Sequence, residues 1–315
     1  MKIGVVIPSY KVKDLIENVL EELLKFNYSV YVVDDACPEK TGEFVNEIYG
    51  DKIKVIFNDV NLGVGGAVKQ GYIKALNDKC DVIVKLDGDG QMNPKLIPNL
   101  IKPIINYESD YVKGNRFFNI RTLRNMPTTR LIGNSILSLF NKVVSGYWEI
   151  LDPTNGFTAI HKSALERIEL NKIDNRFFFE SDMLFRLSTI NAVVSDIPMD
   201  AKYSNEKSNL SIRKVIFDFP PKYFTRFFKR LFYTYFLRNL SFATFELLFG
   251  FLLFNFGIIF GAIKWNQSIE TGIVSSTGTI MVSVLPIILG FQLLLSFLNF
   301  DINNTPKKPL CKIFD

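Results

Sequence analysis

The sequence predicts an α/β domain with an open, mostly parallel sheet, followed by two helices that span a membrane. Over the first half of the chain, short apolar runs rich in β-branched residues alternate with amphipathic segments. This alternation is typical of βαβ units with right-handed crossovers. Acidic residues stand at the ends of two of the runs, and two long apolar stretches occupy the last third of the chain.

The predicted strands are almost continuously apolar, as expected where helices cover both faces of a sheet. We expect strands at 3–8, 29–34, 52–57 and 81–87, and helices at 14–26, 41–49, 64–77 and 94–107. Further along, 111–116 reads as a strand end, 130–144 as a helix, 156–161 as a strand and 179–191 as a helix. Ligands of such sheets bind beyond the carboxyl ends of the strands.

A basic, aromatic segment precedes the apolar stretches. From Pro221 onward, aromatic residues recur in pairs four apart, and basic residues fill the positions between them. The basic residues are Lys222, Arg226, Lys229, Arg230 and Arg238. The pattern predicts an amphipathic helix in the membrane interface, with packing on the domain's own core as the alternative.

The apolar stretches 240–263 and 277–300 are each about 24 residues long. As helices they measure roughly 36 Å, enough to cross a hydrocarbon core of about 30 Å. Basic residues are dense before the first stretch, and Lys307, Lys308 and Lys312 follow the second. The positive-inside rule therefore predicts two cytoplasmic termini and an external loop at 264–276. Glu246 lies within the first span, where we expect it to pair, to snorkel or to mark a helix contact.

The expected organisation is a cytoplasmic domain at 1–205, an interfacial segment at 206–239, a two-helix membrane hairpin at 240–300 and a cytoplasmic tail at 301–315. Such hairpins often pack with copies of themselves, so a homo-oligomer through the spans is one expectation. The N-terminal apolar run lacks the layout of a signal peptide, which also favours a cytoplasmic first domain.

Composition limits the classes of function. The net charge is +5, but the basic residues cluster beside the apolar stretches. This favours contact with anionic lipid head groups over nucleic acid. The three cysteines, Cys37, Cys80 and Cys311, are far apart and form no CxxC pair. Their spacing argues against a disulfide framework and against a cysteine zinc site.

The motif Asp87-Gly-Asp89-Gly-Gln91 directly follows an apolar run. Two carboxylates one residue apart on a turn can reach a divalent cation that a diphosphate already coordinates, because Mg²⁺ combines few carboxylates with water and phosphate oxygens. The glycines allow the tight backbone that this requires. The twelfth position counted from Asp87 is Pro98 rather than Glu, which argues against a calcium loop.

The glycine-rich stretch 61–67, which includes Gly65, precedes a predicted helix. Closely spaced glycines let backbone N–H groups approach phosphate at a helix N-terminus. The alternative is a turn that lets the helix pack tightly on the sheet. Asp34 and Asp35 end an apolar run, where they could hold a base or a ribose, or stand as a solvated strand end.

Several other polar residues are candidates for the site. Arg116 and Arg130 are possible phosphate partners. Glu180 and Asp182 open a predicted helix, where carboxylates also stabilise the N-terminus, so a site role and a capping role both remain open. His161 is the single histidine, and a structural role is expected for it.

These motifs, in this order, resemble the family 2 glycosyltransferases, and within them the polyprenyl-phosphate glycosyltransferases of the dolichyl-phosphate mannose synthase and bacterial undecaprenyl-phosphate glucosyltransferase type. The matching pieces are Ile7-Pro-Ser-Tyr10, Val33-Asp-Asp35, Asn61-Leu-Gly-Val-Gly-Gly-Ala67, Asp87-Gly-Asp-Gly-Gln91, Gly114-Asn-Arg116, Asp152-Pro-Thr-Asn-Gly-Phe157 and Phe179-Glu-Ser-Asp182. Their joint order is far more specific than any one motif.

The resemblance implies a GT-A fold, a nucleotide-sugar donor (a UDP- or GDP-hexose) and Mg²⁺ or Mn²⁺. By matching motif, the residues that would hold the nucleotide are Pro8, Tyr10, Asp34 and Asp35. Those that would hold the metal are Asp87, Asp89 and Gln91. The residues that would steer the lipid phosphate and the donor diphosphate are Arg116, Arg130 and Lys207.

The chain also departs from the family pattern. Lys11-Val12 stands where members often have Asn-Glu, which removes a carboxylate near the nucleotide and leaves the base undetermined. Ala36-Cys37 replaces Gly-Ser. No QxxRW motif follows the acidic pair, which argues against processive polymer synthesis.

The expected activity is inverting transfer of a hexose to a polyprenyl phosphate at the cytoplasmic face of a membrane. The same fold could instead act on a glycan or a protein, with the helices as an anchor. A non-catalytic membrane scaffold is a further alternative, against which the retention of Asp87 and Asp89 argues.

Overall fold

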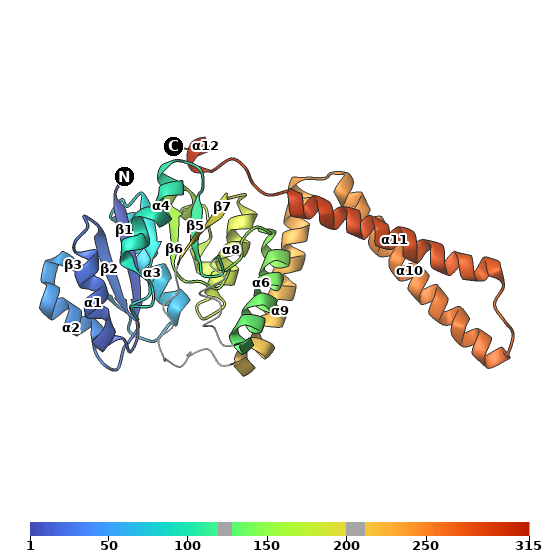
Figure 1. Cartoon of the computed structure of the whole chain (residues 1–315), viewed down its shortest axis with the longest axis horizontal. Helices are drawn as coiled ribbons and strands as arrows, with labels where there is room; N and C mark the ends of the chain where they lie inside the picture. Colours follow the sequence, from blue (N-terminus) through green and yellow to red (C-terminus); the bar gives the residue numbers. More distant parts are fainter. Residues whose placement is uncertain (119–127, 200–211, 315) are drawn as a thin grey trace. The chain divides into compact units, whose positions relative to one another are not determined.

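A seven-stranded sheet with helices on both faces forms the first part of the molecule (Figure 1). The computed structural model describes residues 1–118, 128–199 and 212–314. The chain divides into one unit of Met1–Arg230 with Pro306–Asp315, and a second unit of Leu231–Thr305. The strands are β1 (Ile3–Ser9), β2 (Ser29–Asp34), β3 (Ile53–Phe57), β4 (Val82–Lys85), β5 (Tyr111–Asn115), β6 (Thr158–His161) and β7 (Val194–Pro198).

Most helices of the first unit match predicted helices, but no prediction covers the two short helices at 162–165 and 311–314. They are α1 (Lys13–Leu23), α2 (Thr41–Tyr49), α3 (Val64–Asn77), α4 (Ile97–Ile105), α6 (Thr128–Ser145), α7 (Lys162–Leu165), α8 (Phe179–Thr189), α9 (Ile212–Leu231) and α12 (Cys311–Phe314). The predicted helix 94–107 is divided into a 3-10 turn, Pro94–Leu96, and α4. Pro98 lies in the first turn of α4, where a missing N–H is tolerated.

The strand order is β3-β2-β1-β4-β6-β5-β7. Strand β6 runs antiparallel to both β4 and β5, and the other neighbouring pairs are parallel. This confirms the mostly parallel sheet. The reversal of β6 has a consequence for the site: the segment that precedes β6 lies at the edge of the sheet where the parallel strands end.

Both faces of the sheet are covered by apolar side chains, as the continuous apolar runs predict. Helices α1, α2 and α4 cover one face, around Val5, Ile7 and Val84. Helices α3, α7 and α8 cover the other, around Val6 and Ile83. His161 is buried and caps α7 through Ser163, so the expected structural histidine is found.

Helix α9 begins at Ile212 and includes Pro220 and Pro221, so it starts well before the predicted position. Two of its basic residues, Lys222 and Arg226, form ion pairs with Asp174 and Asp182 of the domain. A third residue of the helix, Tyr223, packs on Phe178 and Phe219. One face of α9 therefore packs on the domain, while Phe224 and Phe228 are exposed.

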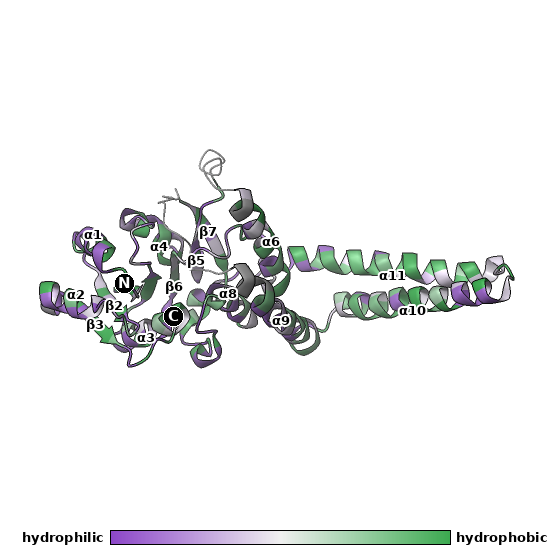
Figure 2. Cartoon of the chain, turned by 90° about the horizontal axis from the view of Figure 1, so that it is seen from below, coloured by the Kyte–Doolittle hydropathy of each residue, from purple (hydrophilic) through white to green (hydrophobic). Residues whose placement is uncertain are grey.

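The second unit contains the two apolar helices, α10 (Phe242–Thr271) and α11 (Thr277–Asn303). Figure 2 shows them as apolar over most of their length. Both are long and apolar enough to cross a membrane. Helix α10 continues beyond the predicted end at 263 and stops at Gly272, which has the left-handed φ of +67° common at helix ends. Glu246 accepts a hydrogen bond from Ser296 on α11, so it marks a helix contact.

The C-terminal segment, Pro306–Asp315, belongs to the first unit rather than to the apolar helices. The backbone N–H groups of Leu310 and Cys311 donate to the carboxylate of Asp110, at 2.9 Å and 3.1 Å. Asp110 is fully buried just before β5, and Leu310 joins the apolar core. The guanidinium of Arg167 lies 3.7 Å from the centre of the Phe314 ring. The tail is therefore an integral part of the folded domain.

Candidate active site

The carboxyl ends of β1, β2, β4 and β5 and the segment before β6 meet at one edge of the sheet. Parallel strands end at the same edge, where open α/β sheets bind their ligands. All described motifs that carry predicted site residues lie on or next to this edge. The acidic motifs that follow β2 and β4 therefore lie at the same edge of the sheet.

Asp87 is tied to Glu180 by a buried lysine. The ammonium of Lys85 lies 3.1 Å from Asp87 Oδ1 and 2.9 Å from Glu180 Oε1. Burial disfavours the charged form of Lys85, but the two carboxylates outweigh it, and the pKa of Lys85 is raised. Lysine in an otherwise apolar strand was a signal in the sequence, because lysine is rarely buried without partners. None of the motifs described above includes it.

Asp89 and Gln91 lie on the turn that follows. Asp89 Oδ1 accepts a hydrogen bond from the Gln91 N–H at 3.0 Å, and both residues are half-buried. Gly90 has a φ of +74°, so the turn uses the freedom of glycine. Within the described ranges no three His, Cys, Asp or Glu residues gather into a metal cluster. Two carboxylates and an amide oxygen nevertheless suit a hard divalent cation that also binds a diphosphate.

Asp34 and Asp35 are buried and engaged with backbone groups. Asp34 accepts from the N–H groups of Cys37 and Gly42, at 2.7 Å and 2.6 Å. Asp35 accepts from the N–H groups of Leu62 and Gly63, at 2.8 Å and 2.7 Å. Asp34 and Asp35 therefore fix the loops around the end of β2. This structural role differs from both alternatives suggested by the sequence, which were contact with a base or ribose and a solvated strand end. A carboxylate has about four acceptor sites, so a nucleotide contact is compatible with these bonds.

The glycine-rich stretch packs against the start of α8. A Cβ on Gly65 would lie 2.4 Å from the Asp174 carbonyl oxygen and 2.8 Å from the Phe179 ring. The N–H of Gly66 donates to the Asn175 carbonyl, and that of Gly63 to Asp35. Close packing is therefore one reason for these glycines, although the partner is α8 and its preceding loop rather than the sheet alone. Phosphate contact by the remaining amides stays a prediction.

Pro8 and Tyr10 stand at the end of β1. Pro8 is half-buried, and the Tyr10 side chain is 43% exposed. The next residue, Lys11, has a φ of +56°, and its N–H donates to the Cys37 sulfur. This hydrogen bond joins the loops that follow β1 and β2. The Tyr10 ring lies at the surface beside them.

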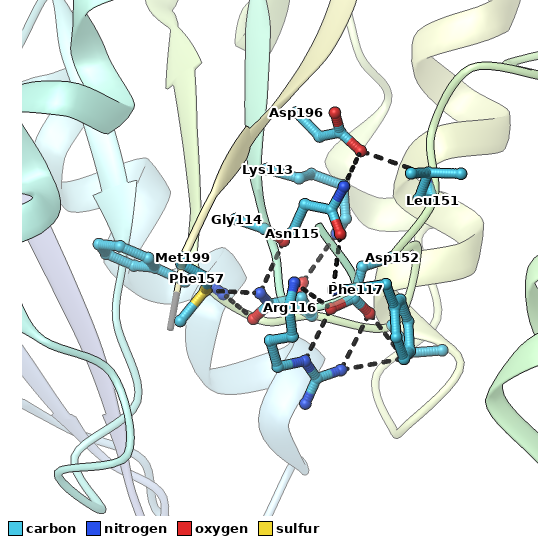
Figure 3. Close-up of polar contacts among 12 residues, drawn as sticks. Lys113, Gly114, Asn115, Arg116, Phe117, Leu151, Asp152, Phe157, Asp196 and Met199 are labelled. Carbon is cyan, nitrogen blue, oxygen red and sulfur yellow. Dashed lines mark hydrogen bonds and ion pairs between the residues drawn. The ribbon is translucent and has the colours of Figure 1, made fainter. Parts of the chain in front are cut away.

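Arg116 is held by a carboxylate from another loop (Figure 3). Its Nε and Nη2 donate to the two oxygens of Asp152, at 2.7 Å and 2.9 Å. Asn155 supports the same loop, since its side-chain amide donates to the Gly114 carbonyl. Lys113 is fully buried and donates to the Asn155 carbonyl at 2.8 Å. Burial lowers the pKa of Lys113 to about 8, although the nearby Glu180 and Asp152 carboxylates favour the charged form.

Glu180 and Asp182 lie two residues apart on α8 and point to different sides of the helix. Glu180 faces Lys85, whereas Asp182 is fully buried and accepts from Nε and Nη2 of Arg226, at 2.9 Å and 3.2 Å. Asp182 also accepts from the Asp174 N–H. The structure thus brings Glu180 to the acidic motif and joins Asp182 to α9.

The side chains of two predicted site residues lie outside the described part of the molecule. Arg130 lies in α6, after the described range resumes at Thr128, but its side chain is outside the described part of the molecule. Lys207 lies outside the described residues. Their roles stay predictions.

The fold and the site together define a glycosyltransferase of the GT-A fold. The chain belongs to glycosyl transferase family 2, which matches residues 4–169. UDP-N-acetylglucosamine–dolichyl-phosphate N-acetylglucosaminyltransferase of Methanococcus voltae is 30% identical over 217 residues, which are 64% of this chain and 86% of that protein. Dolichol-phosphate mannosyltransferase of Pyrococcus furiosus is 33% identical over 186 residues, which are 57% of this chain and 52% of that protein.

Among solved structures, glucosyl-3-phosphoglycerate synthase of Mycobacterium tuberculosis, in complex with Mn²⁺, UDP and glucosyl-3-phosphoglycerate, matches with a TM-score of 0.51 and 16% identity. The match covers 73% of this chain and 78% of the other. At this identity the likeness shows the fold. The predicted family, fold and enzyme class are confirmed.

Proposed function

We propose that the protein transfers a hexose from a nucleotide-sugar to a polyprenyl phosphate at the membrane surface, giving a polyprenyl-phosphate sugar. One observation carries this proposal: a single chain combines a family 2 site with two helices apolar enough to cross a membrane. The two relatives described above are named for dolichyl-phosphate and dolichol-phosphate transfer. An enzyme with a soluble acceptor would gain little from such helices.

On the donor side, Pro8, Tyr10, Asp34 and Asp35 would bind the nucleotide. Asp87, Asp89 and Gln91 would hold Mg²⁺ or Mn²⁺, and the structural relative that contains Mn²⁺ and UDP is consistent with this choice. A bound divalent cation supplies positive charge beside the leaving diphosphate. The half-buried Asp89 and Gln91 lie on a turn that Gly90 shapes, which suits a site that closes around a phosphate group.

On the acceptor side, Arg116, Arg130 and Lys207 would bring together two anions that otherwise repel each other. Asp152 orients the Arg116 guanidinium through two hydrogen bonds. The phosphate monoester attacks the anomeric carbon and displaces the nucleoside diphosphate in one inverting step. It needs little help from a general base, because a phosphate monoester with a second pKa of about 6 is largely dianionic near neutrality.

For the topology, we propose that the catalytic domain and both termini are cytoplasmic. The tail after α11 bonds to Asp110 within the catalytic unit, which supports a chain that leaves and returns on one side of the membrane. Basic residues flank the apolar helices on that side. The exposed aromatic residues of α9 would rest at the membrane interface. Self-association through the apolar helices stays a prediction.

The decisive experiment supplies radiolabelled nucleotide-sugars and a short-chain polyprenyl phosphate to the purified protein. The proposal expects label in an organic-soluble product, together with nucleotide release. Label that appears only in a water-soluble glycan or protein would support the anchored-glycosyltransferase alternative instead. A panel of UDP- and GDP-hexoses that gives no turnover with any acceptor would favour the scaffold alternative. The same panel identifies the sugar and the base.

A further inference from the structure

The buried Lys85 occupies a position that the proposed reaction leaves unexplained. It is the last residue of β4, between two apolar strands, and it is 1% exposed. Its ammonium contacts a carboxylate from each of two segments, Asp87 of the acidic motif and Glu180 of α8. The two acidic residues are 93 positions apart in the sequence, so the lysine joins them only in the fold.

A third segment, the one that precedes β6, packs closely against the Lys85–Asp87 ion pair. A Cβ added to Gly156 would lie 2.4 Å from the Lys85 nitrogen and 2.8 Å from Asp87 Oδ2. Such separations are too short for a real carbon atom, so a side chain at position 156 would displace the Lys85 ammonium or the Asp87 carboxylate. The two oxygens of Asp87 therefore face different neighbours, with Oδ1 toward the ammonium and Oδ2 toward Gly156.

Stability alone is a weak reason for this arrangement. Taking charged groups out of water costs much of what their attraction returns, and well-packed apolar residues often replace buried ion pairs without loss. An apolar residue at the end of β4 would continue the strand pattern of Val82, Ile83 and Val84. The lysine instead fixes a carboxylate that begins the acidic motif.

We propose that Lys85 is a positioning residue, whose ammonium holds Asp87 in one orientation so that the acidic motif meets the donor diphosphate and its cation in a fixed geometry. Glu180 holds the ammonium from the other side, and Gly156 leaves room for it. The inference rests on the proposed function in one respect, the assignment of residues 87–91 to the cation and the diphosphate.

The test compares Lys85→Met with Gly156→Ala, which disturbs the same contact from a different segment. Mn²⁺ binding is measured by electron paramagnetic resonance in the presence of UDP or GDP, without acceptor, and kcat and KM are measured separately. Misplacing a reacting group by about 1 Å can cost up to roughly a hundredfold in rate. Both variants should weaken Mn²⁺ binding severalfold and lower kcat by roughly tenfold or more, with the KM for the lipid acceptor changed less than about twofold.

Two controls separate positioning from folding. Lys162→Met removes a lysine from an ion pair with Asp81, before β4, and Gly133→Ala adds a methyl group where nothing lies within 4 Å. Both should keep Mn²⁺ binding and turnover. Glu180→Gln retains an oxygen that can accept from Lys85, so its Mn²⁺ binding should stay close to that of the wild type. Thermal unfolding of each variant should remain cooperative.

The inference is overturned if Lys85→Met binds Mn²⁺ and turns over as the wild type does. It is overturned as well if Lys85→Met loses activity only because it unfolds, while Gly156→Ala stays folded and keeps wild-type Mn²⁺ binding and turnover. It is also overturned if the wild type binds no Mn²⁺ with either nucleotide. If the wild type binds Mn²⁺ in a Lys85-dependent manner but glycosylates no polyprenyl phosphate, the inference stands and the proposed acceptor is wrong.

Discussion

Asp152 accepts hydrogen bonds from Arg116 with both carboxylate oxygens, at 2.7 Å from Nε and 2.9 Å from Nη2. The Asp152 side chain is fully buried, while that of Arg116 is 24% exposed. Planar, two-bond pairing of this kind fixes the direction of the guanidinium as well as its position. Asp152 therefore fixes both the position and the direction of the Arg116 guanidinium.

Asp152→Asn should impair the binding of the acceptor phosphate. The amide retains one oxygen but loses the charge and one of the two acceptors, so Arg116 turns more freely. We expect the kcat/KM for polyprenyl phosphate to fall roughly tenfold or more, from the misplacement of Arg116. Steady-state kinetics with varied acceptor, at saturating donor, measure this directly.

Asp196→Asn is the matched control. Asp196 accepts from Asn115 and from the Leu151 N–H in the same network, but it does not touch Arg116. Burial raises the pKa of Asp196. Removing its charge therefore costs less stability than removing the charge of a carboxylate with an ordinary pKa. If both variants show the same loss, the network has only a general structural role and the specific Arg116–Asp152 argument fails.

The sequence predicted most of the fold because its signals are local. Apolar runs located the strands, and the glycine and acidic motifs fell at strand ends. Long-range partners were not predictable in the same way. Lys85 meets Glu180 across 95 positions, and only the fold shows that α8 turns Glu180 toward β4 and Asp182 toward α9. Likewise, nothing in the sequence around Leu310 indicates that its N–H donates a hydrogen bond to the Asp110 carboxylate.

Asp182 should matter for stability, whereas Glu180 should matter for turnover. Asp182→Ala leaves Arg226 without its carboxylate in a largely buried position, and breaking such a pair costs about 3–5 kcal/mol when both charges are buried. Because the Arg226 side chain is 18% exposed, we expect about 2–3 kcal/mol. Urea unfolding in detergent measures it.

Glu180→Ala is the comparison for Asp182→Ala. It removes one of the two carboxylates that hold Lys85, so kcat should fall, while Asp87 still pairs with Lys85 and the loss of stability should be smaller than in Asp182→Ala. The reverse pattern, a stable Asp182→Ala enzyme with no turnover, would assign Asp182 to the chemistry and contradict the division made here.

The C-terminal tail should stabilise the catalytic domain. Asp110→Ala removes the acceptor of three N–H groups, those of Val193, Leu310 and Cys311. Each buried donor left without a partner costs about 1–3 kcal/mol, so a loss of about 3 kcal/mol or more in unfolding free energy is expected. Proteolysis should also release the tail faster than in the wild type. Glu108→Ala, on the exposed neighbouring loop, should have neither effect.

Lys113 should make stability depend on pH in the alkaline range. Its pKa is lowered from 10.5 to about 8, chiefly by burial, against the opposing influence of Glu180 and Asp152. Between these two values the unfolded chain binds the proton and the folded protein does not, so the unfolding free energy rises with pH. Below about pH 8 the cost of the buried charge is fully present. The size of the effect is on the order of 3 kcal/mol.

Lys113→Met isolates this contribution, because tyrosines and other lysines that titrate in the same range are common to both proteins. The difference in unfolding free energy between wild type and variant, followed from pH 7 to pH 10.5, should shift in favour of the wild type by on the order of 3 kcal/mol as Lys113 becomes neutral. Neutral lysine still donates to the Asn155 carbonyl, so this bond persists at high pH. A difference that stays constant across the range would mean that Lys113 keeps its ordinary pKa in the folded protein, and that Glu180 and Asp152 fully compensate its burial.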